Sequence, residues 1–289
     1  MASTIVNTSE IVAGDGSSIA GDALSDKIRD YSNFGDVVDL TNNSPSNLHT
    51  RMMGGADIVT LSNANVGGFS NKVNGNLGND VFLVKAGTTT RDFVLGGRED
   101  DTLDFSLSTT GGDWQNGNQG NDVIVGAKNT ELRSILRGGS GDDTITIETG
   151  SKHIAVGDSG QDSIIILGTS RGRVVCRTDG DNAAQNKADA DSITNFVVTR
   201  DKAYIPGVNS IDDLTRETVG ADTYLKASTF INGTIGTRYI VKFENQGDAL
   251  VKSFMDNGRI IVGAAADSAL AALNPTTFLN DSDLGGLFA

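Results

Sequence analysis

Six aspartates recur at a near-constant interval, and each closes a turn rich in glycine, asparagine and aspartate. They are Asp57, Asp80, Asp101, Asp122, Asp143 and Asp162. The intervals between them are 23, 21, 21, 21 and 19 residues. Carboxylate oxygens, with backbone carbonyls that glycine leaves accessible, are the hard ligands of which Ca²⁺ takes about six to eight. The spacing therefore predicts a row of calcium sites between successive turns.

An apolar segment follows each aspartate, and this segment must position the turns. Side chains alternate faces along a strand, so the second and fourth residues after each aspartate should face one way. Eleven of these twelve residues are apolar, from Val59 and Leu61 to Ile164 and Ile166. A repeat of this length is typical of a solenoid, whose coils pack only against their neighbours. We therefore predict an all-β chain with stacked parallel strands over 80–85, 101–106, 122–126, 143–148 and 162–167.

The turn from Gly138 to Ile145 reads G-G-S-G-D-D-T-I and contains every fixed position of the pattern G-G-x-G-x-D-x-U. This pattern resembles the haemolysin-type calcium-binding (RTX) repeat, which occurs in parallel β-helices. The other copies are degenerate, with non-glycine residues at glycine positions: Met52, Met53, Asn76, Glu99, Asn118 and Asp158. The resemblance spans about 110 of the 289 residues. The expected fold is a right-handed parallel β-solenoid, a β-roll or β-helix.

The resemblance implies a set of calcium ligands. The six repeated aspartates would supply carboxylates, and carbonyls would come from Gly78, Gly120, Gly141 and Gly160. In the family the motifs run back to back, whereas here one motif occurs per coil of about 21 residues. A longer turn and a second strand complete each coil, as in Lys85–Arg91 followed by Asp92–Leu95. We therefore expect two sheets, with one metal-type edge and one plain edge.

A metal-free explanation of the same turns stays open. Gly, Asn and Asp form tight turns with positive φ and hydrogen-bond them with their side chains, without any cation. Against this explanation, aspartates on successive coils would lie about 4.8 Å apart, and unneutralised charges at that spacing oppose stacking. One divalent cation in each gap would offset most of the formal net charge of −14.

The second strand of each coil has a weaker apolar pattern. Phe93, Trp114, Ile135 and Ile154 share a register, but Gln115, Asn116 and Arg137 interrupt the apolar pattern. Trp114 is therefore interpreted as a core residue of that sheet rather than as a platform for a ligand.

No group of residues indicates catalysis. His49 and His153 are the two histidines, and His153 lies beside a turn, where a turn hydrogen bond or solvation is expected. G-x-S-x-G, H-E-x-x-H and P-loop motifs do not occur. The outward positions of the first strands, such as Val81, Val123 and Thr144, contain no acid/base pair. We predict that the protein is not an enzyme, with a carbohydrate-binding or carbohydrate-cleaving β-helix as an alternative.

The composition of the chain restricts the classes of partner that we expect the protein to bind. The net charge of −14 disfavours nucleic acid and anionic membranes. No apolar run is long enough to span a bilayer, so membrane insertion is not expected, and the first ten residues lack the features of a Sec-type signal. Cys176, the one cysteine, excludes internal disulfides and is expected to be buried.

The chain is divided into four parts: 1–50, an N-terminal cap or degenerate coils; 51–189, the RTX-like solenoid; 190–263, a β-rich cap; and 264–289, a tail. The cap is expected to contain strands at Tyr224–Ala227, Thr237–Glu244, Ala249–Phe254 and Arg259–Val262 and a short helix at Ile211–Glu217. The tail is expected to begin with a brief helix at Asp267–Leu273. It is compatible with a type I secretion signal or with a segment that docks in an assembly.

These features favour a non-enzymatic, structural role. We expect a calcium-binding surface protein in an extracellular layer or matrix, or at the cell surface. The alternative is a decoration or appendage protein on the surface of a phage virion. The expected partners are further copies of the chain, or a host surface or particle lattice.

Overall fold

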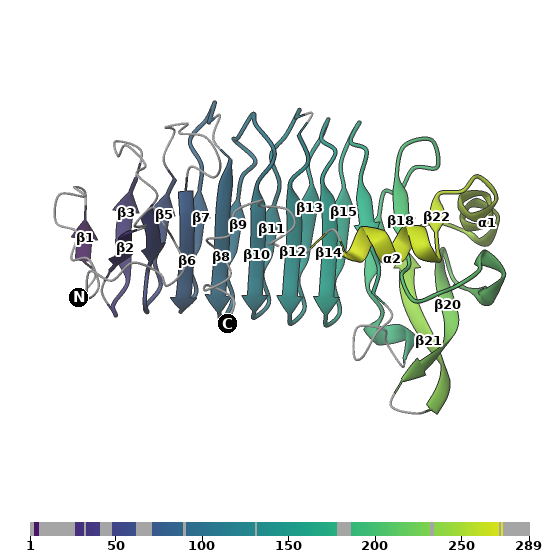
Figure 1. Cartoon of the computed structure of the whole chain (residues 1–289). Coiled ribbons are helices and arrows are strands. Elements are labelled where there is room, and N and C mark those ends of the chain that lie inside the picture. The colour runs from purple at the N-terminus through teal and green to yellow at the C-terminus, as the bar shows by residue number, and fades with distance from the viewer. Residues whose placement is uncertain are drawn as a thin grey trace.

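The computed structural model describes residues 3–5, 27–31, 33–40, 48–61, 71–88, 91–130, 132–177, 186–231, 234–271 and 273. Their strands stack along one axis as a parallel β-solenoid, which confirms the predicted fold class (Figure 1). Each coil contributes one strand to each of two sheets. A cap with antiparallel strands and a helix lies at the C-terminal end of the stack (Figure 1).

The first sheet has 12 strands and contains the segment after each repeated aspartate. In spatial order its strands are β1 (Ser3–Ile5), β3 (Asp36–Asp39), β5 (Ile58–Thr60), β7 (Val81–Leu83), β9 (Thr102–Asp104), β11 (Val123–Val125), β13 (Thr144–Ile147), β15 (Ser163–Ile166), β17 (Ser192–Thr194), β21 (Thr234–Phe243), β20 (Asp222–Ile231) and β19 (Leu214–Val219). Val123 pairs with Thr102 on one side and Thr144 on the other. The predicted strands therefore stack in the predicted register.

The second sheet has 10 strands, all paired in parallel. In spatial order they are β2 (Lys27–Asp30), β4 (Leu48–Arg51), β6 (Asn71–Leu77), β8 (Asp92–Arg98), β10 (Trp114–Gln119), β12 (Ile135–Ser140), β14 (Ile154–Ser159), β16 (Arg173–Val175), β18 (Lys202–Tyr204) and β22 (Ile260–Ile261). Five of these strands, β6 to β14, extend into the glycine-rich turn and thereby fix its position.

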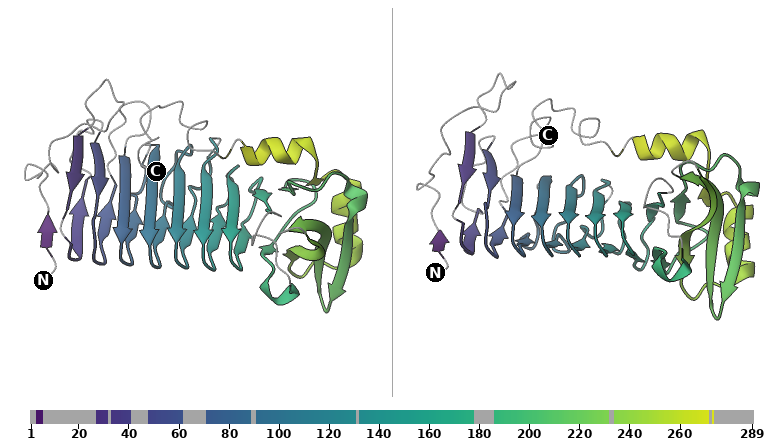
Figure 2. Two further views of the ribbon diagram at one scale, coloured as in Figure 1. Left: turned by 60° about the horizontal axis from the view of Figure 1, so that its bottom comes forward. Right: turned by 90° about the horizontal axis from the view of Figure 1, so that it is seen from below.

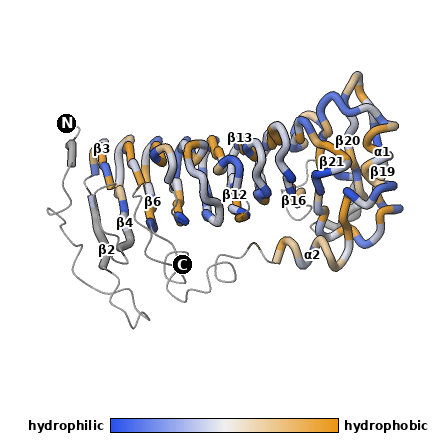
Figure 3. The backbone as a smooth tube through the Cα atoms, turned by 90° about the horizontal axis from the view of Figure 1, so that it is seen from above, coloured by the Kyte–Doolittle hydropathy of each residue, from blue (hydrophilic) through white to orange (hydrophobic). Residues whose placement is uncertain are grey.

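The core lies between the two sheets. The predicted ladder of the first sheet is fully buried, with Phe82, Leu103, Ile124 and Ile145 each 0% exposed. Facing it from the second sheet are Val73, Val94, Leu136, Ala155 and Val174, in the same apolar cluster. Hydrophobic and hydrophilic segments are interspersed along the coloured part of the solenoid in Figure 3. This stacking of aliphatic side chains is the main source of stability in a solenoid, because each coil has no other core.

The structure confirms that Trp114 is a buried residue of the second sheet, but its register lies on the outer face of that sheet and not between the two sheets. The neighbouring residue Gln115 pairs with Val94 and Leu136, which belong to the core. Since adjacent side chains point to opposite faces, Trp114 lies on the outer face of the sheet, with Phe93 stacked beside it at a centroid distance of 6.1 Å. Both rings are nevertheless buried, in a separate apolar cluster. The sequence pattern is ambiguous here because both faces of these strands carry apolar residues.

The solenoid extends beyond the predicted 51–189 segment at both ends. The described strands within 1–50 pair in parallel, so that part of the chain forms coils. At the other end β17 and β18 continue the two sheets past residue 190, and β21 and β22 pair with them in parallel. The cap is therefore continuous with the stack.

Two predictions inside the cap need correction. The segment predicted as a strand at Ala249–Phe254 is the helix α1 (Asp248–Asp256), whose Val251 and Phe254 are buried three residues apart on one face. The helix expected at Ile211–Glu217 is a single 3₁₀ turn, η3 (Ile211–Asp213), capped by Ser210 as predicted and followed by β19. The β19 strand instead pairs with β20, which satisfies its backbone in a sheet.

The remaining helical elements are η2 (Lys187–Asp189) and α2 (Ala264–Ala271). The α2 helix confirms a helix at the start of the predicted tail, while 272 and 274–289 lie outside the described residues. Among the helices that the structure describes, none has the length and apolar character needed to cross a bilayer.

Replacing Ile145 by aspartate tests the core assignment. A carboxylate at this fully buried position should lower the free energy of unfolding by several kcal/mol, because nothing there can pair with the charge. The matched control is Thr146→Asp, one residue later in the same strand but on the outer face. Urea unfolding should show a large loss for Ile145→Asp and a small one for Thr146→Asp. Equal effects would contradict the inward orientation of Ile145.

Candidate metal centre: the aspartate column

The turns that carry the repeated aspartates have a left-handed backbone at two positions. Motif position four has φ between 117° and 136° in Gly78, Gly120, Gly141 and Gly160. Position two is occupied by Asn76, Asn118 and Asp158 in three coils, with φ values of 71°, 78° and 77°. Gly adopts this conformation freely, and Asn and Asp tolerate it better than other residues do. The degenerate motifs therefore keep the same turn.

A continuous column of hydrogen bonds runs along this edge of the solenoid. The backbone N–H of each aspartate donates to Oδ1 of the corresponding aspartate one coil later, over 2.6 to 3.0 Å. We call this set the aspartate column: Asp36, Asp57, Asp80, Asp101, Asp122, Asp143, Asp162 and Asp191. Every member is at most 7% exposed. The structure therefore brings all six predicted aspartates into one buried row.

The sequence reasoning missed the two end members, Asp36 and Asp191. Neither follows a recognisable G-G-x-G turn. The signal that could have found them is the apolar alternation after the aspartate: Val38 and Leu40 follow Asp36, and Ile193 follows Asp191. All three of these apolar side chains are in the core.

In five of the six motifs, a glycine five residues before the aspartate makes room for its carboxylate, whereas Met52 occupies this position before Asp57. At these glycines a Cβ would collide with Oδ2 of the aspartate: Gly75, Gly96, Gly117, Gly138 and Gly157. At Gly138 the same Cβ would also lie 2.7 Å from the carbonyl oxygen of Gly157, one coil further on. The carboxylate of Asp143 and the carbonyl of Gly157 thus border one small space. The first glycine of each motif was the available signal for this contact.

The second carboxylate oxygen is the unusual feature of the column. Oδ2 is buried in each of the six predicted aspartates, and within the described part of the chain it has no hydrogen-bond partner. Burying a charged oxygen without a partner is costly. Six successive coils therefore repeat one unsatisfied acceptor at the same place.

Burial raises the pKa of all six carboxyl groups above the ordinary value of 3.8; nearby carboxylates add to the shift and the hydrogen bond from the preceding coil opposes it. The pKa is about 6 at Asp57 and Asp122, about 7 at Asp80 and Asp162, and about 8 at Asp101 and Asp143. Two neighbouring carboxylates about 4.8 Å apart repel by roughly 3 kcal/mol at an effective dielectric constant of about 20. The column thus favours any positive charge that can enter it.

A proton or a cation would satisfy Oδ2. A protonated Asp143 could donate to the carbonyl oxygen that borders the same space, and a cation could be bound by both oxygens. The described residues contain no cluster of three or more His, Cys, Asp or Glu side chains arranged to hold a metal. A cation at this edge would therefore take one carboxylate from each adjacent coil and the rest of its ligands from backbone oxygens. This donor set consists of hard oxygens, which suits Ca²⁺.

The glycines predicted to supply carbonyl ligands form a separate row. A Cβ added at Gly141 would collide with the carbonyl oxygen of Gly120, and a Cβ added at Gly160 would collide with that of Gly141. Gly78 and Gly120 likewise lie against carbonyls of the preceding coil, at Gly55 and Glu99. These carbonyls thus point along the stack. In the structure the carbonyl that borders the carboxylate of Asp143 belongs to a first-position glycine instead.

The plain edge carries a second buried ladder that the sequence did not reveal. The N–H of Asp92 donates to Oδ1 of Asp113, the N–H of Asp113 to Oγ of Ser134, and the N–H of Ser134 to Nδ1 of His153, over 3.0 to 3.2 Å. These four residues occupy the same position in successive coils. Different polar side chains thus have the same role. Each accepts a hydrogen bond from the backbone N–H at the start of a strand in the second sheet.

Asp113, Ser134 and His153 are the residue types of a catalytic triad, but their geometry is different. Ser134 Oγ donates to Asp113 Oδ2 over 3.0 Å, and His153 Nε2 lies 2.6 Å from the carbonyl oxygen of Ala127. His153 therefore contacts the backbone of Ser134 and does not accept the hydroxyl proton, as a triad base must. All three side chains are 0% exposed. The turn-bonding role predicted for His153 is confirmed, and burial lowers its pKa to about 4.

No known family model and no curated protein matches the sequence.

Replacing Gly138 by alanine tests the packing of Asp143. The new Cβ would meet the carboxylate and the Gly157 carbonyl at once, so the coil must shift, and we expect a loss of about 1–3 kcal/mol. The control is Gly247→Ala, because nothing lies within 4 Å of a Cβ added there. Unfolding in urea should distinguish the two variants. A Gly138→Ala protein as stable as the control would contradict the close approach.

The raised pKa values predict an unusual pH dependence. Folded-state values of about 6 to 8 exceed the ordinary 3.8, so between these values the folded protein binds more protons than the unfolded chain. In cation-free buffer the free energy of unfolding should therefore fall as pH rises from about 4 to about 8. Asp143→Asn removes one titrating group and should flatten this decline. Constant or rising stability across this range would show that the carboxylates are ionised in the folded state.

Proposed function

We propose that the protein is a non-catalytic, rigid β-solenoid rod whose coils are held together along one edge by calcium ions. The observation that carries this proposal is the row of six buried Oδ2 atoms that have no protein partner in the described residues. A ligand-binding role for these atoms explains why the same unsatisfied acceptor recurs in six successive coils, although each instance is costly.

Asp57, Asp80, Asp101, Asp122, Asp143 and Asp162 would hold the ions, one between each pair of adjacent coils. Backbone oxygens of the turns, such as that of Gly157 beside Asp143, would complete the coordination. When bound, calcium neutralises the carboxylates and removes the repulsion along the stack.

A partly degenerate site of this kind suits millimolar calcium, the range of extracellular modules. This calcium range supports a proposed location in an extracellular layer or matrix, or at a cell surface. The net charge of −14 favours the binding of divalent cations and disfavours the binding of nucleic acid.

The outer face of the first sheet supports the non-catalytic part of the proposal. Its described carboxylates include Asp39 and Asp104, which are three strands apart, or about 14 Å. Glycoside hydrolysis requires two carboxyl groups within roughly 5–9.5 Å. Asp39 is also paired with Lys85 over 3.5 Å, and Asp104 accepts the backbone N–H of Ser106. These two groups therefore do not form a hydrolytic pair.

Calcium should stabilise the folded protein at pH 8, where the column is most highly charged in the absence of metal. One independent site adds about 1.4 kcal/mol at ten times its dissociation constant, and several sites should raise the melting temperature cooperatively. Calorimetric titration should show binding at millimolar calcium, and the gain in stability should shrink at pH 5, where protons compete.

Two variants separate calcium binding from protonation. Asp143→Asn removes a proposed ligand, so it should be more stable than the parent without calcium and gain less from it. Asp104→Asn, on the outer face of the same sheet, should gain as much as the parent. If calcium neither binds nor stabilises at pH 8, protons alone satisfy the column and the proposed cation role is wrong.

A further inference from the structure

The coils at the C-terminal end of the solenoid carry a cluster of basic side chains next to the plain edge. We call it the basic strip: Arg133, Arg171, Arg173, Arg200, Lys202 and Arg259. These are six of the 23 lysines and arginines in a chain whose net charge is −14. The calcium proposal makes no use of them, because the aspartate column lies at the other edge of each coil.

One column of the strip belongs to the outer face of the second sheet. Arg173 pairs with Lys202 in the parallel strands β16 and β18. The next strand, β22, continues the column with Arg259, because the N–H of Ala203 donates to the carbonyl oxygen of Arg259 over 2.9 Å. Ala203 and Val174 belong to the core, so the basic side chains beside them point outward.

The other column lies two residues earlier, at the plain edge itself. It begins at Arg133, which directly precedes Ser134 of the buried ladder. The equivalent positions on the following coils hold Lys152, Arg171 and Arg200, as the pairing of the residues two places later establishes. Arg133 and Arg171 are exposed. The two columns are about 6.7 Å apart, and successive coils are about 4.8 Å apart.

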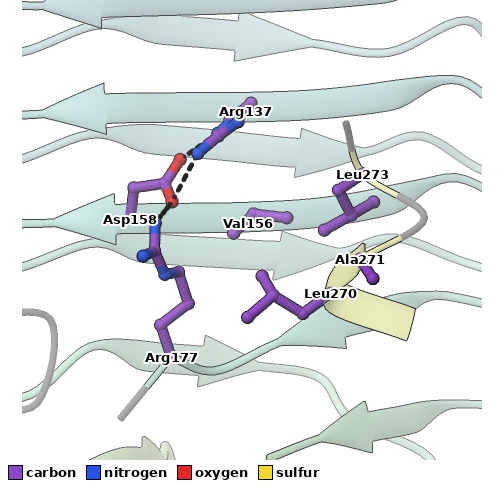
Figure 4. A pocket seen from close by; sticks show the side chains of 7 residues that line it. All are labelled: Arg137, Val156, Asp158, Arg177, Leu270, Ala271 and Leu273. Atoms are coloured by element: carbon purple, nitrogen blue, oxygen red, sulfur yellow. Dashed lines mark hydrogen bonds and ion pairs between the residues drawn. The ribbon is translucent and has the colours of Figure 1, made fainter. Parts of the chain in front are cut away.

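The six cations of the strip have no ionic partner within the described part of the chain. No described carboxylate oxygen lies within 4.0 Å of their side-chain nitrogens. Arg137 and Arg177 differ in this respect, because both bond Asp158, the latter over 2.5 Å (Figure 4). An acidic protein thus keeps a group of basic side chains together without neutralising them.

The charges of the strip are close enough to influence one another. Partial burial and the charge of Arg173 lower the pKa of Arg133. At the other end, Nη2 of Arg259 donates to the carbonyl oxygen of Thr199, next to Arg200, over 3.4 Å. The Nε atoms of Arg200 and Arg259 are buried and lack a hydrogen-bond partner among the described residues. A ligand with anionic oxygens would reduce the repulsion and supply such partners.

The buried carboxylate of Asp201 does not neutralise this end of the strip. Its two oxygens accept the N–H of Gly172 over 2.9 Å and the N–H of Val197 over 2.8 Å. Burial raises the pKa of Asp201, while these hydrogen bonds and the charges of Arg200 and Arg259 oppose the shift. The two guanidinium groups therefore lie near this carboxylate without pairing with it.

The α2 helix bounds the strip on one side. It forms a layer outside the solenoid (Figure 2), where it contacts β16. Its Leu270 packs against the apolar cluster that contains Val175, two residues after Arg173 on the same outer face. Asp267 of this helix accepts the N–H of Gly207 over 2.9 Å. A ligand of the strip would therefore lie along the plain edge, beside α2.

We propose that the basic strip binds a linear acidic polysaccharide, which lies along the axis of the solenoid. The coils of Arg133 and Arg259 are four coil spacings apart, or about 19 Å. A compact anion would reach only neighbouring coils, whereas a polymer with an acidic group on each sugar unit can contact the whole strip. Five of the six cations are arginines, which bind carboxylates and related oxyanions through parallel hydrogen bonds.

Nucleic acid fits this surface less well. Single-stranded nucleic acid stacks its bases on aromatic side chains, whereas Tyr204 beside the strip is half-buried against the apolar cluster. Screening confines the field of the strip to about 8 Å at physiological ionic strength. A slender saccharide chain stays within that distance, but a duplex extends beyond it towards a protein of net charge −14.

Binding of polymers to the intact protein tests the proposal. The probes are heparin, which carries sulfate groups, polygalacturonate, which carries carboxylates, and neutral dextran. A chelator is present, so that calcium cannot bridge an acidic polymer to the aspartate column. An acidic probe should bind and dextran should not. The double variant Arg133→Ser with Arg171→Ser should weaken binding about tenfold and reduce the slope of log K against log salt by about two.

The matched control is Lys85→Ser with Arg98→Ser, which changes the net charge equally at exposed positions on earlier coils. It should bind as the parent does, and far-ultraviolet circular dichroism verifies that both variants keep their β structure. Binding of heparin alone would assign sulfate as the recognised group, and binding of polygalacturonate alone would assign carboxylate. Failure of both acidic probes to bind, or an equal loss in the two double variants, would overturn the proposal.

Single-stranded DNA and anionic lipid vesicles are the competing polyanions. If the parent binds either as tightly as the polysaccharides and the strip variant loses that binding, the strip belongs to another class of partner and the proposal is wrong. Chain length provides a further measurement. Heparin fragments should bind more tightly with length until they span about 19 Å, and then level off. An affinity independent of length would indicate a site for a single anion and contradict a chain along the axis.

Discussion

The interaction on which the structure depends is the hydrogen bond from an aspartate N–H to the carboxylate of the next coil. It recurs along the whole aspartate column, over 2.6 to 3.0 Å. A parallel stack must satisfy the backbone at every turn, where no strand neighbour is available. The carboxylate provides that acceptor at one edge. At the plain edge Asp113, Ser134 and His153 provide it with three different side chains.

The identity of the other turn residues follows from this interaction. In five coils the carboxylate lies against a residue without a side chain, which explains a glycine such as Gly138 five positions before Asp143. The chain must then reverse through left-handed backbone, which explains Gly141 and the substitute Asn118, and Glu99 adopts the same conformation with φ 69°. The residues of the motif thus allow one carboxylate to be buried. They belong to one coil, but the carboxylate accepts its hydrogen bond from the neighbouring coil.

The same interaction carries a cost, which connects the fold to its proposed function. A carboxylate buried by the stack leaves Oδ2 without a donor in the described residues, and its pKa rises, as at Asp143, to about 8. Protons or calcium can balance this cost, so stability becomes dependent on solution conditions.

The sequence by itself determined the repeat, the sheet that follows each aspartate and the six members of the column, because these depend on local conformation and on alternation within one strand. Only the tertiary structure decided which face of the second strands is the core, since Gln115 points inward and Trp114 outward. It also decided that a first-position glycine carbonyl, at Gly157, borders the Asp143 carboxylate. Likewise, the segment predicted as a strand forms the helix α1, because the helix buries Val251 and Phe254 on one face in the cap. In each case the deciding contact joins residues from different coils or elements. The spacing of residues along the sequence does not predict such contacts.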